Sequence, residues 1–209
     1  MWLVLLLLAA YCLGSIPTSI IAGKALRGID IREYGSRNPG ATNTFRVLGW
    51  KIGVAVGIVD IFKGFAAVAL LPLLLPSDSW ASMEARRMLA GFAAVAGHMW
   101  TVFAGFRGGK GVGTAFGVFL GLAPLPSTIA AAVWAALTFG TGYVSLGSIA
   151  AAVALPLLVI TLGVWRGNLS PAVASVSVIV GLLVIIRHRS NISRLIRGEE
   201  NRFGKRGKG

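Results

Sequence analysis

Long apolar stretches constrain this chain more than any other feature of its sequence. Of its 209 residues, 56% are hydrophobic and only 13% are Asp, Glu, Lys or Arg, whereas charged residues make up about a quarter of a soluble domain. A soluble domain of this length would not bury so much apolar surface. A helix that crosses a bilayer needs about 20 predominantly apolar residues, and several stretches approach that length. The sequence therefore predicts an all-α integral membrane protein.

Seven apolar segments are candidates for transmembrane helices. The fourth is short for a simple span, and Pro124 and Pro126 separate it from the fifth. Whether residues 112–142 cross the bilayer as two helices is left open, which gives seven spans or five. We expect seven, over residues 1–23, 52–75, 88–105, 112–125, 127–142, 148–165 and 171–186.

The N-terminal segment is similar to a signal peptide but lacks its flanking features. No positive charge precedes the apolar run, and no small-x-small cleavage site follows it. We therefore expect an uncleaved first span. Cys12 lies within this segment and is the single cysteine of the chain, so no internal disulfide is possible.

The placement of basic residues predicts the orientation of the spans. Sixteen of the 20 Lys and Arg residues lie in residues 24–51, 106–111 and 187–209. The opposite connections hold three, which are Arg86, Arg87 and Arg166. Cytoplasmic loops of membrane proteins are rich in Lys and Arg. We therefore expect the N-terminus outside and the C-terminus in the cytoplasm.

The net charge of +13 is interpreted from the same placement. Because the basic residues alternate with apolar runs, we expect no nucleic-acid partner, and we expect membrane lipids and small anions instead. Residues 1–203 are predicted to form one membrane domain with its active site on the cytoplasmic face. The basic tail, residues 204–209, is predicted to be disordered.

A first polar segment, residues 35–46, reads GSRNPGATNTFR. Pro39 suits the first turn of a helix, and a helix from about Pro39 would direct free N–H groups toward Ser36 as an anion site. Asn43 and Arg46 lie three apart and share a helix face. Each residue alone has an ordinary role as a cap or an interfacial anchor, so the prediction depends on the whole cluster.

A second segment, residues 105–113, reads GFRGGKGVG. Consecutive glycines allow backbone N–H groups to surround a phosphate, and Lys110 adds a positive charge. The segment is not a Walker A loop, because Gly111 stands where that motif has Ser or Thr. The alternative is a flexible turn between spans. We predict a phosphate site at Arg107, Gly108, Gly109, Lys110 and Gly111.

Two further polar segments lie later in the chain. Ser145 belongs to the short segment 143–148 between two spans, which alone is weak evidence of a site. His188 and Asn191 lie three apart near the end of the last span and are candidates for a site. The surrounding segment, residues 187–198, also fits an interfacial helix held by anionic lipid.

Two buried candidates lie inside the apolar segments. Asp60 and Lys63 are three apart, and ionisable residues at membrane depth are functional candidates, but we favour a mutual ion pair near the cytoplasmic end of the span. His98 precedes the glycine-rich segment and is a candidate to orient it. The chain has no Gly-x-Ser-x-Gly elbow, no zinc-ligand spacing and no paired carboxylates in its cytoplasmic segments. We predict no metal and no cofactor.

The polar motifs together resemble one family. They are GSIP at 14–17, GSRNPGATN at 35–43, GH at 97–98, FRGGKGV at 106–112, YVS at 143–145 and RHRSNI at 187–192. In this order over nearly the whole chain, they are similar to the bacterial acyl-phosphate:glycerol-3-phosphate 1-O-acyltransferases of the PlsY type. The resemblance implies seven membrane helices and an enzyme of phospholipid biosynthesis that makes lysophosphatidic acid from acyl phosphate and glycerol 3-phosphate.

The resemblance also implies which residues carry the chemistry. Ser36, Arg46, Lys110, Ser145, His188 and Asn191 would line the substrate site, and Asn43 and the glycines would shape it. Arg46 and Lys110 suit phosphate binding, and Asn191 suits donation to a developing oxyanion. Two candidates remain for the base, His188 and the substrate phosphate. The alternative function is a small membrane transporter of an organophosphate, which would share a cation-lined cluster.

Overall fold

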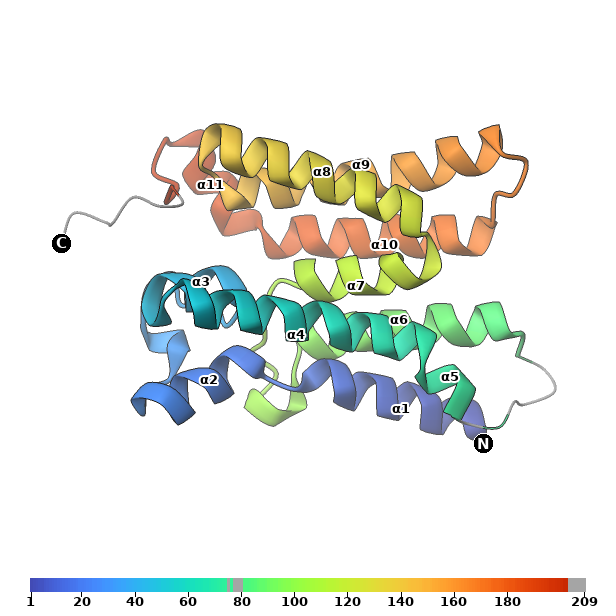
Figure 1. The fold of residues 1–209 in the computed structure, drawn as a ribbon, viewed down its shortest axis with the longest axis horizontal. Helices are drawn as coiled ribbons and strands as arrows, with labels where there is room; N and C mark the ends of the chain where they lie inside the picture. Colours follow the sequence, from blue (N-terminus) through green and yellow to red (C-terminus); the bar gives the residue numbers. More distant parts are fainter. Residues whose placement is uncertain (75, 77–80, 203–209) are drawn as a thin grey trace. The chain divides into compact units, whose positions relative to one another are not determined.

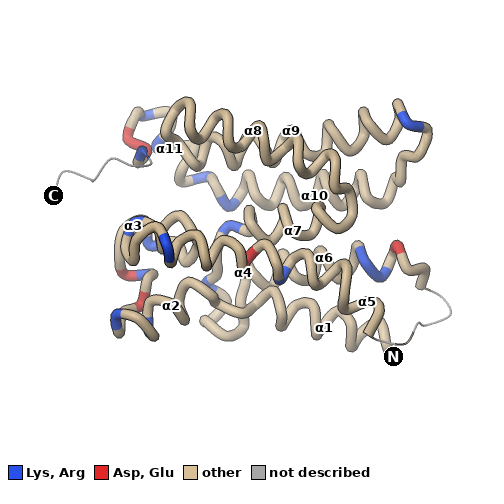
Figure 2. Tube along the Cα trace, in the orientation of Figure 1, with Lys and Arg blue, Asp and Glu red and all other residues tan. Residues whose placement is uncertain are grey.

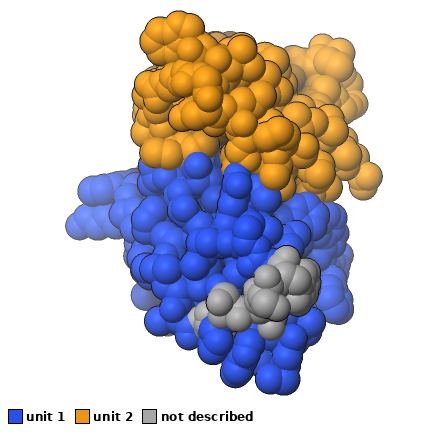
Figure 3. Space-filling view, turned by 90° about the vertical axis from the view of Figure 1, so that its right-hand side faces the viewer, with its two compact units in different colours: residues 1–122 blue, residues 123–209 orange. Residues whose placement is uncertain are grey.

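The computed structural model describes residues 1–74, 76 and 81–202, and over these ranges the chain is helical, with no strand. The predicted all-α class is therefore confirmed. The tail predicted to be disordered, residues 204–209, lies outside the described residues. The chain divides into two compact units, residues 1–122 and 123–209 (Figure 3).

The first unit is built around one long helix (Figure 1). This helix, α4, contacts six other helices of the unit: α1, α2, α3, α5, α6 and α7. The elements of the unit are α1 (Trp2–Ser15), α2 (Thr18–Arg27), η1 (Ile31–Glu33), α3 (Ala41–Leu48), α4 (Trp50–Ala69), α5 (Leu71–Leu74), α6 (Met83–Met99), η2 (Val102–Ala104) and α7 (Val112–Leu122).

The first predicted helix is interrupted. The sequence predicted one helix over 1–23, but α1 ends at Ser15 and α2 begins at Thr18. Pro17 has no N–H group to donate, and a proline disfavours helical dihedrals in the residue before it. Ile16 accordingly has φ −54° and ψ 113°. The break exposes backbone groups within the unit, where the site described below begins.

Small residues allow α4 and α7 to pack closely. A Cβ at Gly64 would lie 2.1 Å from the carbonyl oxygen of Thr114, and one at Gly117 would lie 1.9 Å from that of Ile61. Any larger side chain would therefore push the two helices apart. Membrane helices without a hydrophobic force between them associate in this way, through close backbone contact at small residues.

In residues 123–202, the described part of the second unit, the chain forms four helices. They are α8 (Pro124–Thr141), α9 (Val144–Trp165), α10 (Pro171–Arg187) and α11 (Arg189–Ile196). Consecutive helices pack against each other, and α11 also contacts α9. Proline starts two of them, because Pro124 and Pro171 stand in the first turn, where a missing N–H group leaves no bond unmade. Gly142 ends α8 in the left-handed conformation.

The predicted apolar segments all contain helices. Among the described residues, three helical stretches are long and apolar enough to cross a membrane: Trp2–Arg27, Trp50–Ala69 and Val144–Trp165. The pair Pro171–Arg187 and Arg189–Ile196, bent by 58°, would make a fourth. The segment predicted to be short is the 11-residue α7. Many large apolar side chains of these helices are exposed, as expected for contact with lipid.

Charges lie mainly at the helix ends (Figure 2). In the first unit, basic residues gather around α2, α3 and the start of α4, while Arg86 and Arg87 lie near the start of α6. In the second unit, basic residues gather at α11, and Arg166 lies at the far end of α9. Asp60 and Lys63 are exceptions, because they lie in the middle of α4 and not at its end as predicted.

Candidate functional site

The predicted site residues fall into both units. Ser36, Asn43, Arg46 and the segment 107–111 belong to the first unit. Ser145, His188 and Asn191 belong to the second. Each group has its own network of hydrogen bonds.

Asn43 organises the first polar segment. Its Oδ1 accepts a hydrogen bond from the backbone N–H of Ser36, 2.8 Å away, and its Nδ2 donates to the carbonyl oxygens of Ile31 and Tyr34 at 3.1 and 3.0 Å. The residue is 1% exposed. Because both ends of its amide bond the backbone, Asn43 shapes the segment and fixes the backbone N–H of Ser36.

One detail of this segment differs from the prediction. The helix expected from about Pro39 begins at Ala41, with Gly40 as its extended N-cap, so Pro39 stands outside it. Arg37 has φ +58°, an uncommon conformation for a residue with a side chain. Ser36 and Arg46 are both exposed, so their hydroxyl and guanidinium groups are accessible to a ligand.

The loop before η1 is held by an ion pair. Arg32 Nη2 lies 2.6 Å from Asp30 Oδ2. Hydrogen bonding from the Arg32 side chain lowers the pKa of Asp30 from 3.8 to about 2. Arg32 Nη1 also donates to the carbonyl oxygen of Ala104 at 2.9 Å, which ties this loop to η2, directly before the glycine-rich segment.

The glycine-rich segment uses its first two amides internally. Gly109 N donates to the carbonyl oxygen of His98 at 3.0 Å, and Gly108 N donates to that of Met99 at 3.2 Å. The prediction that the N–H groups of residues 108–111 together surround a phosphate is therefore wrong for Gly108 and Gly109, because they close the end of α6. The cation of Lys110 and the first-turn amides of α7 follow directly, and a helix N-terminus favours anions.

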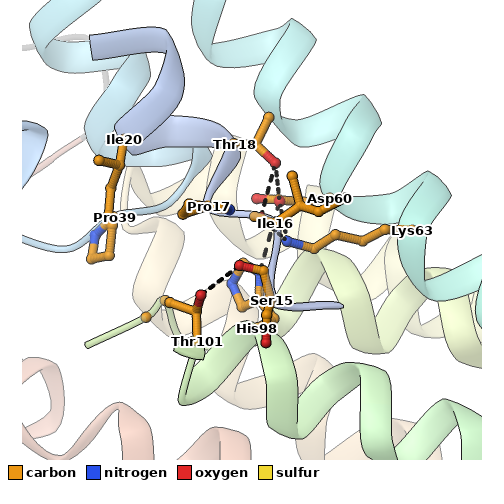
Figure 4. Close-up of a pocket in the computed structure, with 12 residues that line it drawn as sticks. Ser15, Ile16, Pro17, Thr18, Ile20, Pro39, Asp60, Lys63, His98 and Thr101 are labelled. Carbon is orange, nitrogen blue, oxygen red and sulfur yellow. Dashed lines mark hydrogen bonds and ion pairs between the residues drawn. The ribbon is translucent and has the colours of Figure 1, made fainter. Parts of the chain in front are cut away.

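Beneath this loop lies a buried cluster of polar side chains that line a small pocket, part of it open to solvent (Figure 4). Lys63 Nζ lies 2.9 Å from Asp60 Oδ1, which confirms the predicted ion pair. Lys63 also donates to the carbonyl oxygen of Ile16 at 3.0 Å, and Thr18 Oγ1 donates to Asp60 at 3.2 Å. His98 Nδ1 lies 3.7 Å from Asp60 Oδ1.

The second unit places a carboxylate among the predicted residues. Glu200 Oε1 accepts hydrogen bonds from Ser145 Oγ at 2.9 Å and from Asn191 Nδ2 at 2.7 Å, and Glu200 Oε2 accepts from Arg194 Nε at 2.7 Å. The Glu200 side chain is 5% exposed. Glu200 is not among the site residues predicted from the sequence. One acidic pair within a basic terminus was the only available signal.

Glu200 changes how the predicted residues can act. An amide NH2 group has two N–H bonds, and Glu200 accepts one of those of Asn191. The Ser145 hydroxyl donates its proton to the same carboxylate. The Ser145 oxygen can therefore only accept further hydrogen bonds. Arg202 Nε donates to Tyr143 Oη at 3.1 Å, which ties the chain beyond Glu200 to the start of α9.

His188 is held in one orientation. Its Nδ1 lies 2.8 Å from the carbonyl oxygen of Val184, and the residue is 3% exposed. Because a carbonyl oxygen only accepts, Nδ1 carries the proton in this contact, and the neutral ring then has its lone pair on Nε2. His188 is thus arranged to accept a proton at Nε2. Among the described residues, no three His, Cys, Asp or Glu side chains form a group that would hold a metal ion.

Comparisons with known proteins show which family this chain is similar to. A family model described as glycerol-3-phosphate acyltransferase matches residues 4–198. The glycerol-3-phosphate acyltransferases of Chlorobaculum parvum and Chlorobium luteolum are each 44% identical to the chain, over 94% and 98% of this chain and 95% and 99% of those proteins.

Two crystal structures are also similar. Both are of PlsY, an integral membrane glycerol 3-phosphate acyltransferase. The glycerol 3-phosphate form has a TM-score of 0.85 and 40% identity, over 97% of this chain and 96% of that chain. The lysophosphatidic acid form has a TM-score of 0.83 and 39% identity, over 97% and 95%.

Proposed function

Because this chain belongs to the glycerol-3-phosphate acyltransferase family, whose members form lysophosphatidic acid from glycerol 3-phosphate, we propose that its acyl donor is an acyl phosphate. The acceptor is the 1-hydroxyl of glycerol 3-phosphate, and the second product is inorganic phosphate. The observation that carries the proposal is the 40% identity, over 97% of the chain, to PlsY in its glycerol 3-phosphate form.

The chemistry of the described side chains fits this donor. An acyl phosphate is a mixed anhydride, so its acyl group is activated and needs no nucleophile from the enzyme. The acceptor oxygen attacks the acyl carbon, the bond from that carbon to the phosphate oxygen breaks, and phosphate leaves with the electron pair. The protein must then bind phosphoryl groups and stabilise the charge that develops on the leaving phosphate.

Each predicted residue takes a role in this scheme. Lys110 and Arg46 bind phosphoryl groups as cations, and the first turn of α7 supplies amides. Ser36 and Arg107 are exposed and bind substrate. Asn191 is the amide donor assigned to the developing oxyanion, and Ser145 donates to the same Glu200 carboxylate as Asn191. Gly111, with φ +83°, turns the chain into α7.

The proton of the acceptor hydroxyl has two candidate acceptors. His188 suits the role because its Nε2 carries the lone pair of the neutral ring. A phosphate oxygen of the substrate is the second candidate, since phosphate also accepts a proton near neutral pH. A His188 substitution separates the two, as argued in the Discussion.

We place the enzyme in the bacterial inner membrane with seven spans. The N-terminus is outside, the C-terminus is cytoplasmic, and the site faces the cytoplasm. Sixteen basic residues on one side against three on the other support this orientation. We further propose that residues 1–203 work as one membrane domain, which the continuous family match over 4–198 supports. Membrane lipids surround its helices as partners.

An assay of both donors tests the proposal. The purified protein is given palmitoyl phosphate, with and without glycerol 3-phosphate, and palmitoyl-coenzyme A in parallel. We expect phosphate release and lysophosphatidate formation that require the acceptor, and no use of the thioester. Equal use of the thioester would refute the acyl-phosphate donor. Absence of turnover with either donor, in folded protein, would favour the transporter alternative, which the comparisons do not support.

A further inference from the structure

We propose that Asp60, Lys63 and His98 are positioning residues that hold the 98–111 loop in the shape that receives a phosphoryl group. The inference rests on the proposed function, in which Lys110 binds that group. These three side chains contact no substrate in the scheme above. They act on the binding of a phosphate-bearing substrate, which is glycerol 3-phosphate or the acyl phosphate, and not on the acyl transfer itself.

The Asp60–Lys63 ion pair does more than occupy space in the core of the first unit. Asp60 is 5% exposed and Lys63 is 3% exposed, in the middle of an apolar helix. Burying two charges carries a desolvation penalty that the attraction between them only partly offsets, so a buried pair is weak evidence for stability. Its other contacts therefore indicate its role.

Those contacts connect α4 to the break between α1 and α2. Lys63 donates to the carbonyl oxygen of Ile16, and Thr18 donates to Asp60. Ile16 precedes Pro17, which has no N–H group. The break between α1 and α2 therefore leaves backbone carbonyl groups that need hydrogen-bond donors from elsewhere. The same break reaches the loop, because Thr101 Oγ1 donates to the carbonyl oxygen of Ser15.

His98 connects Asp60 to the glycine-rich segment. His98 is 8% exposed, and its ring lies between the two, with Nδ1 3.7 Å from Asp60 Oδ1 (Figure 4). On its other side, a Cβ at Gly109 would lie 2.3 Å from His98 Nε2, and a Cβ at Gly108 would lie 2.0 Å from the His98 carbonyl oxygen. A side chain at Gly108 or Gly109 would therefore collide with His98.

Lys110 directly follows Gly109. The contact between Gly109 and His98 therefore determines the position of the Lys110 ammonium group. α7 begins at Val112, so the same contact also sets the position of its first-turn amides. A displacement of about 1 Å in such groups is enough to weaken binding or catalysis strongly. The cluster thus decides the phosphate site without contacting phosphate.

A double-mutant cycle tests the contact between His98 and Gly109. The variants Gly109→Ala and His98→Ala and the double variant are assayed for KM and kcat, with the concentration of each substrate varied in turn. The substrate whose KM changes is the one whose phosphoryl group binds at the loop. We expect Gly109→Ala to raise one KM about tenfold with kcat within about threefold, and to add less than about threefold in the His98→Ala background. Gly57→Ala is the matched control, since its Cβ would meet the nearest atom at an ordinary 3.5 Å.

A second variant, Asp60→Asn with Lys63→Met, keeps the test decisive if His98→Ala does not fold. It removes both charges together, so no buried charge is left unpaired. We expect a melting temperature within a few degrees of the wild type and the same rise in KM. An unchanged KM in this folded variant, an equal effect of Gly109→Ala in both backgrounds, or an effect confined to kcat would each overturn the inference.

Lys110→Ala separates this inference from the proposed function. If Lys110→Ala leaves both KM values and kcat unchanged, Lys110 does not hold a phosphoryl group and the inference is overturned, whereas the acyl transfer by this variant leaves the proposed function standing. If Lys110→Ala abolishes activity while the cycle shows no coupling between His98 and Gly109, the proposed function stands and the inference alone is overturned.

Discussion

The Ser145 hydroxyl donates a hydrogen bond to the Glu200 carboxylate at 2.9 Å, although the two residues are 55 positions apart. Asn191 and Arg194 donate to the same carboxylate. Glu200 therefore fixes the start of α9 and α11 relative to each other within the second unit. The adjacent pair, Glu199 with Arg197, has the same 2.7 Å ion-pair distance but side chains that are 58% and 56% exposed.

This contrast gives the first prediction. Glu200→Gln keeps an oxygen for Ser145 but removes the charge that faces Arg194, and the loss of a mostly buried, charge-assisted hydrogen bond lowers the free energy of unfolding by about 1–3 kcal/mol. We expect a melting temperature about 2–10 °C lower in detergent. Glu199→Gln is the matched control, because an exposed pair contributes at most about 1 kcal/mol. Equal effects of the two changes would contradict the role given to Glu200.

The second prediction concerns the phosphate-binding cations. Lys110→Ala and Arg46→Ala each remove a cation assigned to a phosphoryl group, so we expect kcat/KM to fall about 100-fold or more with the melting temperature little changed. Steady-state assays on purified protein measure this. Lys24→Ala and Arg27→Ala, which change exposed residues at the end of α2, are the controls. Near-normal rates in either site variant would remove that residue from the site.

The third prediction separates the two candidate bases. If His188 Nε2 takes the proton, kcat/KM falls as the pH is lowered, because protonation of Nε2 removes the acceptor. We then expect His188→Ala to lose most activity and also this pH dependence. The measurement is a pH profile of kcat/KM for both proteins. A variant that keeps most of its activity across the pH range would assign the proton to the substrate phosphate.

The fourth prediction is a pH effect on stability at Asp30. Hydrogen bonding from Arg32 lowers the pKa of Asp30 from 3.8 to about 2. A carboxylate whose pKa is lower in the folded state stabilises the fold above its unfolded pKa, and that stability is lost as the pH falls toward its folded pKa. Asp30→Asn should therefore lower the melting temperature by a constant amount from pH 7 to about pH 5, and the difference should shrink from about pH 4 to about pH 2. A difference that stays constant to the acid end would contradict the pairing.

The fifth prediction concerns topology. In a Cys12→Ala background, single cysteines at Lys51 and Arg197 should react with an impermeant thiol reagent only after cells are permeabilised. Cysteines at Leu125 and Asn168 should react in intact cells, because seven spans place both positions outside. Reaction at Asn168 but not at Leu125 would show that residues 112–142 do not cross as two helices.

Much of the fold followed from local sequence. Apolar runs predicted helices at all seven segments, since a chain in lipid must satisfy its own backbone hydrogen bonds. Prolines and glycines predicted several ends, as at Pro171 and Gly142. The Asp60–Lys63 pair was predicted correctly because residues three apart share a helix face. These are short-range relations, which sequence spacing describes well.

The composition of the sequence located the polar segments. It did not predict which hydrogen bonds their residues make. The glycines at 108 and 109 were assigned to a phosphate, and tertiary structure shows their amides on the end of α6. Asn43 was grouped with substrate-binding residues, and its amide bonds the backbone of residues 31–36. In each case a donor was identified correctly, and only the fold decided which acceptor lies within reach.

The sequence by itself determined that this chain is a helical membrane protein, which side its basic loops favour, and which motifs it shares with one enzyme family. These properties depend on hydropathy, charge and short motifs, all of which are local. Only the tertiary structure decided that Glu200 joins Ser145 and Asn191, and that His98 lies under Gly109. Hydrogen bonds and steric contacts act over a few ångströms, so residues far apart in the sequence meet through the packing of whole helices, which spacing along the chain does not specify.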